Sequence, residues 1–203
     1  MSSIMNYSAL SLRTIAFLVV SLGALLSTTS CGGSGIAFGS IQTAFTFSGG
    51  KHGTIQEPGF WAVEATRFKI IGPNNLLVTS LGVENALPTQ ETKPVAIYDG
   101  GTNNIIATAT ISNLNTLLNG YYWVDITPVT LVAGKEYYIG ALHTAGPNAS
   151  YLRDTGWAHM LPQVQDLDTY FRASSTITVN GWQVGGGNIR HYVANFKAAP
   201  ITP

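Results

Sequence analysis

The chain has 203 residues, ten basic and ten acidic side chains, and no formal net charge. Charged residues make up 10% of the chain, against about 25% in ordinary soluble domains. No nucleic acid partner is expected, because neutralising phosphates requires a basic surface. The nine Tyr, eight Phe and four Trp exclude a disordered chain. The single cysteine excludes an intrachain disulfide and a zinc site built from several cysteines.

The chain begins with a segment typical of export. Residues 1–14 are polar and carry one cation, Arg13, and they lead into an apolar run over residues 15–26. This run is too short to span a bilayer, which requires about 20 apolar residues. A charged start, a short apolar stretch and then small residues predict a secretory signal peptide over residues 1–30.

Cys31 lies at the expected processing point, and a glycine and serine stretch completes a tether over residues 31–36. This arrangement resembles a bacterial lipoprotein signal, which implies that the Cys31 thiol is acylated and holds the protein on a membrane. Thr28 departs from the pattern, since that position usually carries Leu, Val or Ile. The alternative is ordinary cleavage nearby, with Cys31 incidental. No acidic residue follows Cys31, which in a host with two membranes implies the outer membrane or the cell surface.

Residues 37–203 are expected to form a single domain built from strands. Short runs rich in β-branched and aromatic residues recur between clusters of Gly, Pro and Asn. Regular spacing of such runs predicts an all-β fold, an antiparallel β-sandwich of jelly-roll type. Residues 145–168 contain few β-branched side chains and are predicted to be a long loop. The expected strands are 44–47, 66–71, 76–83, 95–98, 105–111, 121–126, 136–142, 175–179 and 191–197. A loop of Asp, Gly, Thr and Asn residues at 99–104 is expected to join 95–98 and 105–111 into a hairpin. Alternate residues of 121–123 are expected to face the core.

Part of this region is similar to a known family. The runs at 78–82, 94–99, 105–110, 120–140 and 192–197 resemble a domain of unknown function that recurs in exported bacterial proteins, often with a PEP-CTERM sorting signal. The resemblance implies a fold of strands and turns, and the family offers no established catalytic residues. A lipid on Cys31 is expected to replace the C-terminal sorting helix as the anchor.

Candidate residues for metal binding or catalysis are few. Asp166 and Asp168 are the only close pair of carboxylates, and on an extended segment they would share a face and offer weak ligands for Ca²⁺. The alternative is a solvated loop. Glycan hydrolysis requires two facing carboxylates about 5 to 10 Å apart, and no serine lies in a GxSxG turn. The expectation is a protein that is not an enzyme and needs no cofactor.

Aromatic residues next to polar ones favour binding. Trp157, with Arg153 and His159, falls in the predicted long loop, and Trp182 with Gln183 follows a turn at Asn180. Flat aromatic faces beside hydrogen-bonding groups suit sugar rings. The alternative is that each tryptophan closes one end of the sandwich.

The sequence therefore predicts an exported, lipid-anchored, noncatalytic cell-envelope β-sandwich that binds a glycan or another surface component. Two alternatives remain open. One is a structural or adhesive envelope protein that associates with itself, and the other is an enzyme acting on a polysaccharide.

Overall fold

The computed structural model describes residues 37–47, 54–56, 61–85, 92–143, 151–153, 158–184 and 192–202. The chain divides into two units, Met1–Gly35 and Ile36–Pro203, and all of these residues belong to the second unit. The predicted signal peptide and Cys31 therefore lie outside the described residues. Within the described ranges every regular element is a strand. No helix there is long and apolar enough to cross a membrane. The predicted all-β class is confirmed.

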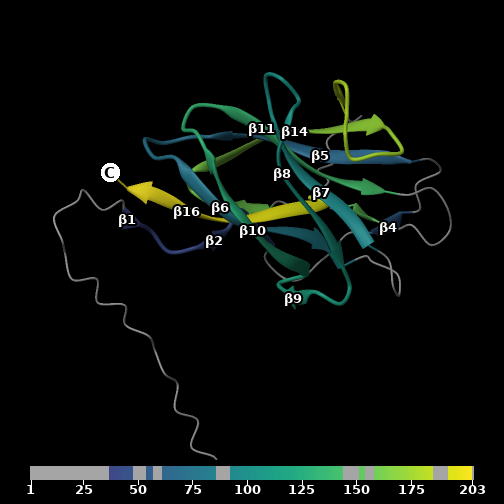
Figure 1. The fold of residues 1–203 in the computed structure, drawn as a ribbon, viewed down its shortest axis with the longest axis horizontal. Helices are drawn as coiled ribbons and strands as arrows, with labels where there is room; N and C mark the ends of the chain where they lie inside the picture. Colours follow the sequence, from purple (N-terminus) through teal and green to yellow (C-terminus); the bar gives the residue numbers. More distant parts are fainter. Residues whose placement is uncertain are drawn as a thin grey trace, which may run out of the picture. The chain divides into compact units, whose positions relative to one another are not determined.

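Two antiparallel sheets make up most of the fold (Figure 1). The first sheet consists, in spatial order, of β1 (Ala37–Phe38), β16 (Ala194–Thr202), β6 (Leu76–Glu84), β10 (Tyr121–Leu131) and β9 (Thr116–Leu118), with β2 (Gln42–Thr43) also paired to β16. The second sheet consists of β15 (Gln183–Val184), β14 (Val164–Ala173), β5 (Ala62–Ile70), β11 (Glu136–His143), β7 (Thr92–Asp99) and β8 (Ile105–Ser112).

Two short strand pairs complete the described elements. They are β12 (Tyr151–Arg153) with β4 (Thr54–Gln56), and β13 (Ala158–Met160) with β3 (Phe45–Phe47). Most connections between the long strands cross from one sheet to the other, whereas β7 and β8 form a hairpin within one sheet. Such crossings are typical of β-sandwiches with Greek-key connections.

The main core lies between the inner faces of the two sheets. Phe68 from the second sheet lies 5.1 Å, centroid to centroid, from Phe196 of the first sheet and 6.3 Å from Phe45 of β3. All three rings are at most 1% exposed. The alternation of side chains along each strand supplies these residues, since every second position of β5 and β16 faces the partner sheet.

One cross-strand pair in the first sheet explains a glycine. Trp123 of β10 lies opposite Gly82 of β6, and a Cβ atom at Gly82 would approach the Trp123 ring to 2.7 Å. The ring is 5% exposed, and the Nζ of Lys197 lies 4.4 Å from its centroid, within reach of a cation–π interaction. Trp123 is thus part of the packing of this sheet.

Two sequence predictions about individual segments are wrong. Residues 145–168 were expected to be a loop, but β12, β13 and the start of β14 fall within them because β4, β3 and β5 supply pairing partners. Residues 175–179 were expected to be a strand, but residues 175–177 form bends and residues 178–179 have irregular backbone. Ile177 and Val179 of this segment pack on the outer face of the second sheet, so their apolar character reflects burial there and not pairing in a ladder.

A neutral cleft as the candidate functional site

The outer face of the second sheet is covered by residues 174–182, here named the covering segment. Beneath it, Val63, Ala65 and Ala96 of the sheet form a second cluster of buried residues, separate from the main core. Val179 of the covering segment is 5% exposed. The Tyr98 hydroxyl donates a 2.6 Å hydrogen bond to the carbonyl oxygen of Ile177. Burial raises the pKa of Tyr98, so that its hydroxyl remains a donor well into alkaline conditions.

Trp182 ends the covering segment and is held in an aromatic cluster. Its ring stacks on Tyr138 with centroids 4.8 Å apart and an interplanar angle of 21°, and it meets Tyr98 edge-on at 5.1 Å. Tyr138 in turn meets Tyr170 edge-on at 5.2 Å. These geometries are the favourable ones for aromatic pairs. Trp182 therefore fastens the end of the covering segment to the sheet.

Arg67 lies at the margin of this aromatic cluster. Its guanidinium carbon is 5.9 Å from the ring centroid of Tyr138 and 5.8 Å from that of Tyr170. The Arg67 Nη1 donates a 3.1 Å hydrogen bond to the Tyr170 hydroxyl, and Nη2 forms an ion pair with Glu136. The hydrogen bond to Tyr170 is the main cause of the raised pKa of Arg67. Arg67 thus remains a cation that ties β5, β11 and β14 together.

The turn between β7 and β8 faces the covering segment. The Asp99 carboxylate accepts hydrogen bonds from the N–H of Gly101 at 3.0 Å, from the N–H of Thr102 at 2.9 Å and from the Thr102 hydroxyl at 3.0 Å. These bonds, that of the Thr102 N–H above all, lower the pKa of Asp99. Asn103 has a φ of 61°, a conformation that asparagine tolerates better than most residues. The Asp99 side chain therefore fixes the shape of this turn.

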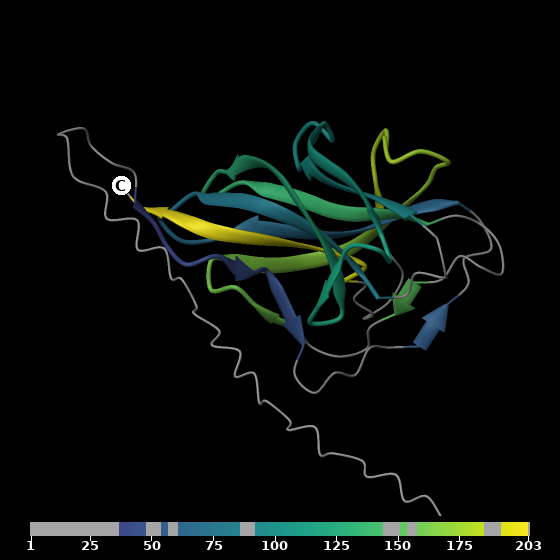
Figure 2. The same ribbon diagram turned by 60° about the horizontal axis from the view of Figure 1, so that its bottom comes forward.

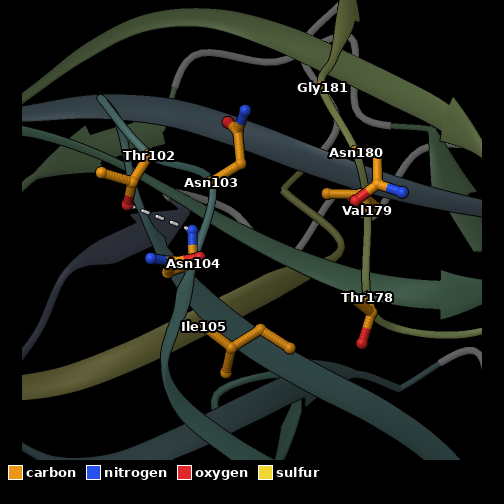
Figure 3. A pocket seen from close by; sticks show the side chains of 8 residues that line it. All are labelled: Thr102, Asn103, Asn104, Ile105, Thr178, Val179, Asn180 and Gly181. Atoms are coloured by element: carbon orange, nitrogen blue, oxygen red, sulfur yellow. Dashed lines mark hydrogen bonds between the residues drawn. The ribbon is translucent and has the colours of Figure 1, made fainter.

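A cleft of about 450 Å³ lies between this turn and the covering segment. Figure 3 shows two rows of side chains across it, and Figure 2 shows the two loops projecting from the same side of the second sheet. Among the described residues, no charged side chain lines the cleft, although three amides and two hydroxyls do. The lining residues are Thr102, Asn103, Asn104, Ile105, Thr178, Val179, Asn180 and Gly181.

The predicted binding residues that the structure describes lie on several different elements. Trp182 is partly buried and has a ring face stacked on Tyr138, while Gln183 of β15 is exposed. His159 is exposed on β13, in a different sheet. Arg153 belongs to β12, where only its backbone pairing with Thr54 is described. Trp157 lies outside the described residues. Trp182 is thus the predicted aromatic contact that the structure describes, and it supports the covering segment.

The predicted Ca²⁺ pair is separated by a β-bulge. Asp166 pairs with Phe68 of β5 and Asp168 pairs with Arg67, with the register shift between them. Because Phe68 and Arg67 are neighbours on a strand, their side chains and those of their partners point to opposite faces. The expectation that Asp166 and Asp168 share a face is therefore wrong. Asp166 accepts a 2.9 Å hydrogen bond from the Tyr192 hydroxyl, and Asp168 accepts one of 2.8 Å from the N–H of Thr169.

The same separation bears on the enzyme alternative, since carboxylates on opposite faces of β14 cannot act on one glycosidic bond. Among the described residues, no group of three or more His, Cys, Asp or Glu side chains could hold a metal ion.

Sequence reasoning missed the cleft residues, although it recognised both of their turns. The glycine and asparagine run at 100–104 and the pair Asn180 and Gly181 were identified as turns, and Gly181 does have a φ of +95°. The two turns are more than 70 residues apart in the chain, and only the sheet brings them together. Trp61, at the start of β5, is 43% exposed and was also missed, because nothing in its neighbours predicts exposure.

Comparison with known proteins gave no match, either to a protein-family model or to a curated protein. The resemblance to the exported bacterial family stays a prediction, and the function has to be argued from the cleft.

Proposed function

We propose that this protein is an exported, lipid-anchored, noncatalytic β-sandwich of the cell envelope, and that it binds a neutral glycan or another uncharged surface component in the cleft. The observation that carries the proposal is the chemistry of the cleft lining, in which the described residues provide amides and hydroxyls around two apolar side chains and contribute no charge. A sugar ring offers hydroxyls at its edge and C–H groups on its faces, so it matches such a lining.

Each class of lining residue has a role in this binding. The amides of Asn103, Asn104 and Asn180 each offer two donors and an acceptor, which allows paired hydrogen bonds to neighbouring hydroxyls. Ile105, which is partly exposed, provides apolar contact for the faces of the ring, while Val179 lines the cleft with only 5% of its surface exposed. The volume of about 450 Å³ falls within the range of about 300 to 1,000 Å³ that is usual for small-molecule sites.

The cleft is also built to hold its shape before a ligand arrives. The Asp99 carboxylate closes one wall through three hydrogen bonds, and the bond from Tyr98 to Ile177 holds the other wall. Ordering such loops in advance reduces the entropy lost on binding. Trp182 supports the second wall from behind, so its contribution to binding is indirect.

Export and anchoring are supported by the residues before the domain. The apolar run at 15–26, the cysteine at 31 and the uncharged tether favour a lipoprotein. Growth with a clickable palmitate analogue is expected to label the wild-type chain and to leave Cys31→Ser unlabelled. An unlabelled wild-type chain would remove the lipid anchor from the proposal.

The cleft is tested by affinity electrophoresis in gels that contain neutral or acidic polysaccharides. Asn104→Ala and Asn180→Ala are each expected to weaken retardation by a neutral polymer by about 2- to 10-fold, the worth of one or two neutral hydrogen bonds. Asn85→Ala is the matched control, because Asn85 is an exposed amide outside the cleft. Melting temperatures should be the same for all four proteins. Retardation that is unchanged in both cleft variants would refute the site.

A further inference from the structure

The outer edge of β8 lacks the charges and prolines that usually protect an exposed strand. β8 pairs with β7 on one side, and none of the described strands pairs with it on the other side. The strand carries no charge and no proline. Its pairing with β7 shifts register once, at Ile106 near the start of the strand, and is regular from Ala107 to Ser112. Natural proteins normally protect such edges with charges, prolines or bulges, since an open edge is a template for another strand.

A groove of about 430 Å³ runs beside this edge, between β8 and β10. From Val124 onwards β10 also has an open side in the described part of the chain, because β9 pairs with residues 121–123 alone. The apolar part of the lining comes from both strands. Asp125 is the charged residue of the groove, and its carboxylate accepts a 2.7 Å hydrogen bond from the Ser80 hydroxyl. The apolar lining residues are Ile106, Ala107, Ala109, Val124, Ile126 and Val129.

We propose that this edge docks a second copy of the chain, with β8 of one protomer pairing antiparallel with β8 of its partner around a two-fold axis. Two-fold symmetry requires the same patch on both protomers. Opposite residues in an antiparallel pair point to the same face of the sheet. The core-facing side chains of the two protomers therefore lie on one side only when odd-numbered residues pair with odd-numbered ones and even with even, so that the axis passes through a residue. Near the middle of β8 that residue is Thr108, Ala109 or Thr110. With the axis at Ala109, Thr108 lies opposite Thr110 and Ala107 lies opposite Ile111.

The charge distribution favours a second copy over a charged partner. No residue from Gly100 to Val124 carries a charge, so the two edges meet without repulsion between like charges. Exposed threonines pair with each other on the outer face, a favourable cross-strand combination. Small and branched apolar residues pair on the groove side. The strand is therefore complementary to itself in size and in polarity.

The same arrangement covers the groove. The second sheet of one protomer would continue into the second sheet of its partner across the axis. The β10 edges of the two protomers would then lie on the same face of this joined sheet. The apolar lining of each groove would then face that of the partner, where burial is favourable. This inference does not rest on the ligand of the cleft, because the cleft is lined by the turn that joins β7 to β8 and not by the open edge of β8.

Cysteine crosslinking in cells tests the geometry with the full chain. In a Cys31→Ser background, which removes the one native thiol, Thr108→Cys, Ala109→Cys and Thr110→Cys are oxidised in whole cells, so that the test does not depend on the lipid anchor. Residues at or beside the axis come within the Cα separation of about 4.4 to 6.8 Å that a disulfide accepts. At least one of the three should give a covalent dimer, while Val184→Cys, exposed on β15, should not. No dimer at any of the three, equal dimer at the control, or crosslinks only to other proteins would overturn the proposal.

Light scattering on the full chain in detergent tests the edge without crosslinking. The wild type and Gln165→Lys, a control at an exposed position of β14, should have the mass of a dimer. Thr110→Lys places like charges close together at the axis and should weaken the dimer about tenfold or more. A wild-type mass that stays monomeric at every concentration, or a Thr110→Lys protein that remains as dimeric as the control, would contradict self-docking.

Discussion

The two faces of the second sheet are buried by different means. On the inner face, large side chains such as Phe68, Ile97 and Ile139 pack against a complete partner sheet and are fully buried. On the outer face, small residues such as Ala65 and Ala96 are covered by a single irregular segment. That segment is held by one stacked tryptophan and one tyrosine hydrogen bond. The inner face therefore determines whether the chain folds, and the outer face determines whether the cleft keeps its shape.

The largest expected effect belongs to the inner face. Phe68→Ala removes a fully buried ring that contacts Phe45, Tyr137 and Phe196. Cavity formation of this kind costs about 3 to 5 kcal/mol in the free energy of unfolding. Urea unfolding measures the loss, and Phe68→Leu, which refills most of the volume, should recover more than half of it. A Phe68→Ala protein within 1 kcal/mol of the wild type, on the order expected of surface changes, would show that the core has been misplaced.

A smaller effect is expected on the outer face. Trp182→Ala removes the stack on Tyr138 and the edge-on contact with Tyr98, and because the ring is only partly buried the cost should be about 1 to 3 kcal/mol. Amide hydrogen exchange should rise in residues 174–182 and stay unchanged in β6. Gln183→Ala is the control, since Gln183 is exposed. Lost glycan binding with unchanged melting and exchange would instead make Trp182 a direct ligand contact.

The smallest effect concerns the hydroxyl of Tyr98. Tyr98→Phe removes one hydrogen bond to the covering segment and should cost about 1 kcal/mol at neutral pH. The pKa of Tyr98 is raised by burial above the ordinary value of 10.0, so the folded state keeps a proton that the unfolded chain releases. Stability is therefore fully present below pH 10 and falls as the pH rises towards the folded pKa. Burial raises the pKa values of Tyr137 and Tyr138 as well.

Thermal melting between neutral and strongly alkaline pH tests this assignment. The wild type should lose stability steeply above pH 10, and Tyr98→Phe should show a shallower decline because one of the three phenols whose pKa is raised by burial is gone. Equal slopes for the two proteins would mean that Tyr98 ionises as freely in the folded state as in the unfolded chain.

Much of the fold follows from alternation in the sequence. The pattern at residues 121–123 predicted that neighbours would face opposite sides, and Tyr121 and Trp123 are buried while Tyr122 is partly exposed. The β7–β8 hairpin was also predicted, with its loop of Gly, Thr and Asn residues. These features are local, because a strand or a turn is encoded by residues that are adjacent in the chain.

The predictions that were wrong or missing concern features that depend on residues far away in the sequence. The bulge between Asp166 and Asp168 exists because of the register with β5, which no run of residues in β14 reveals. The apolar residues at 177 and 179 pack on a sheet face built from strands far away in the sequence. The cleft itself arises from two turns on either side of that face, so its residues could be recognised as turns but not as neighbours.

The central claim is that the uncharged cleft on the outer face binds a neutral glycan. Backbone amide shifts of the full chain in detergent, recorded by NMR during titration with neutral oligosaccharides, test it most directly. The account predicts saturable shifts concentrated in residues 102–105 and 178–181, with β16 and β6 unaffected. Shifts centred elsewhere, or no shifts with any neutral oligosaccharide at millimolar concentration, would contradict it.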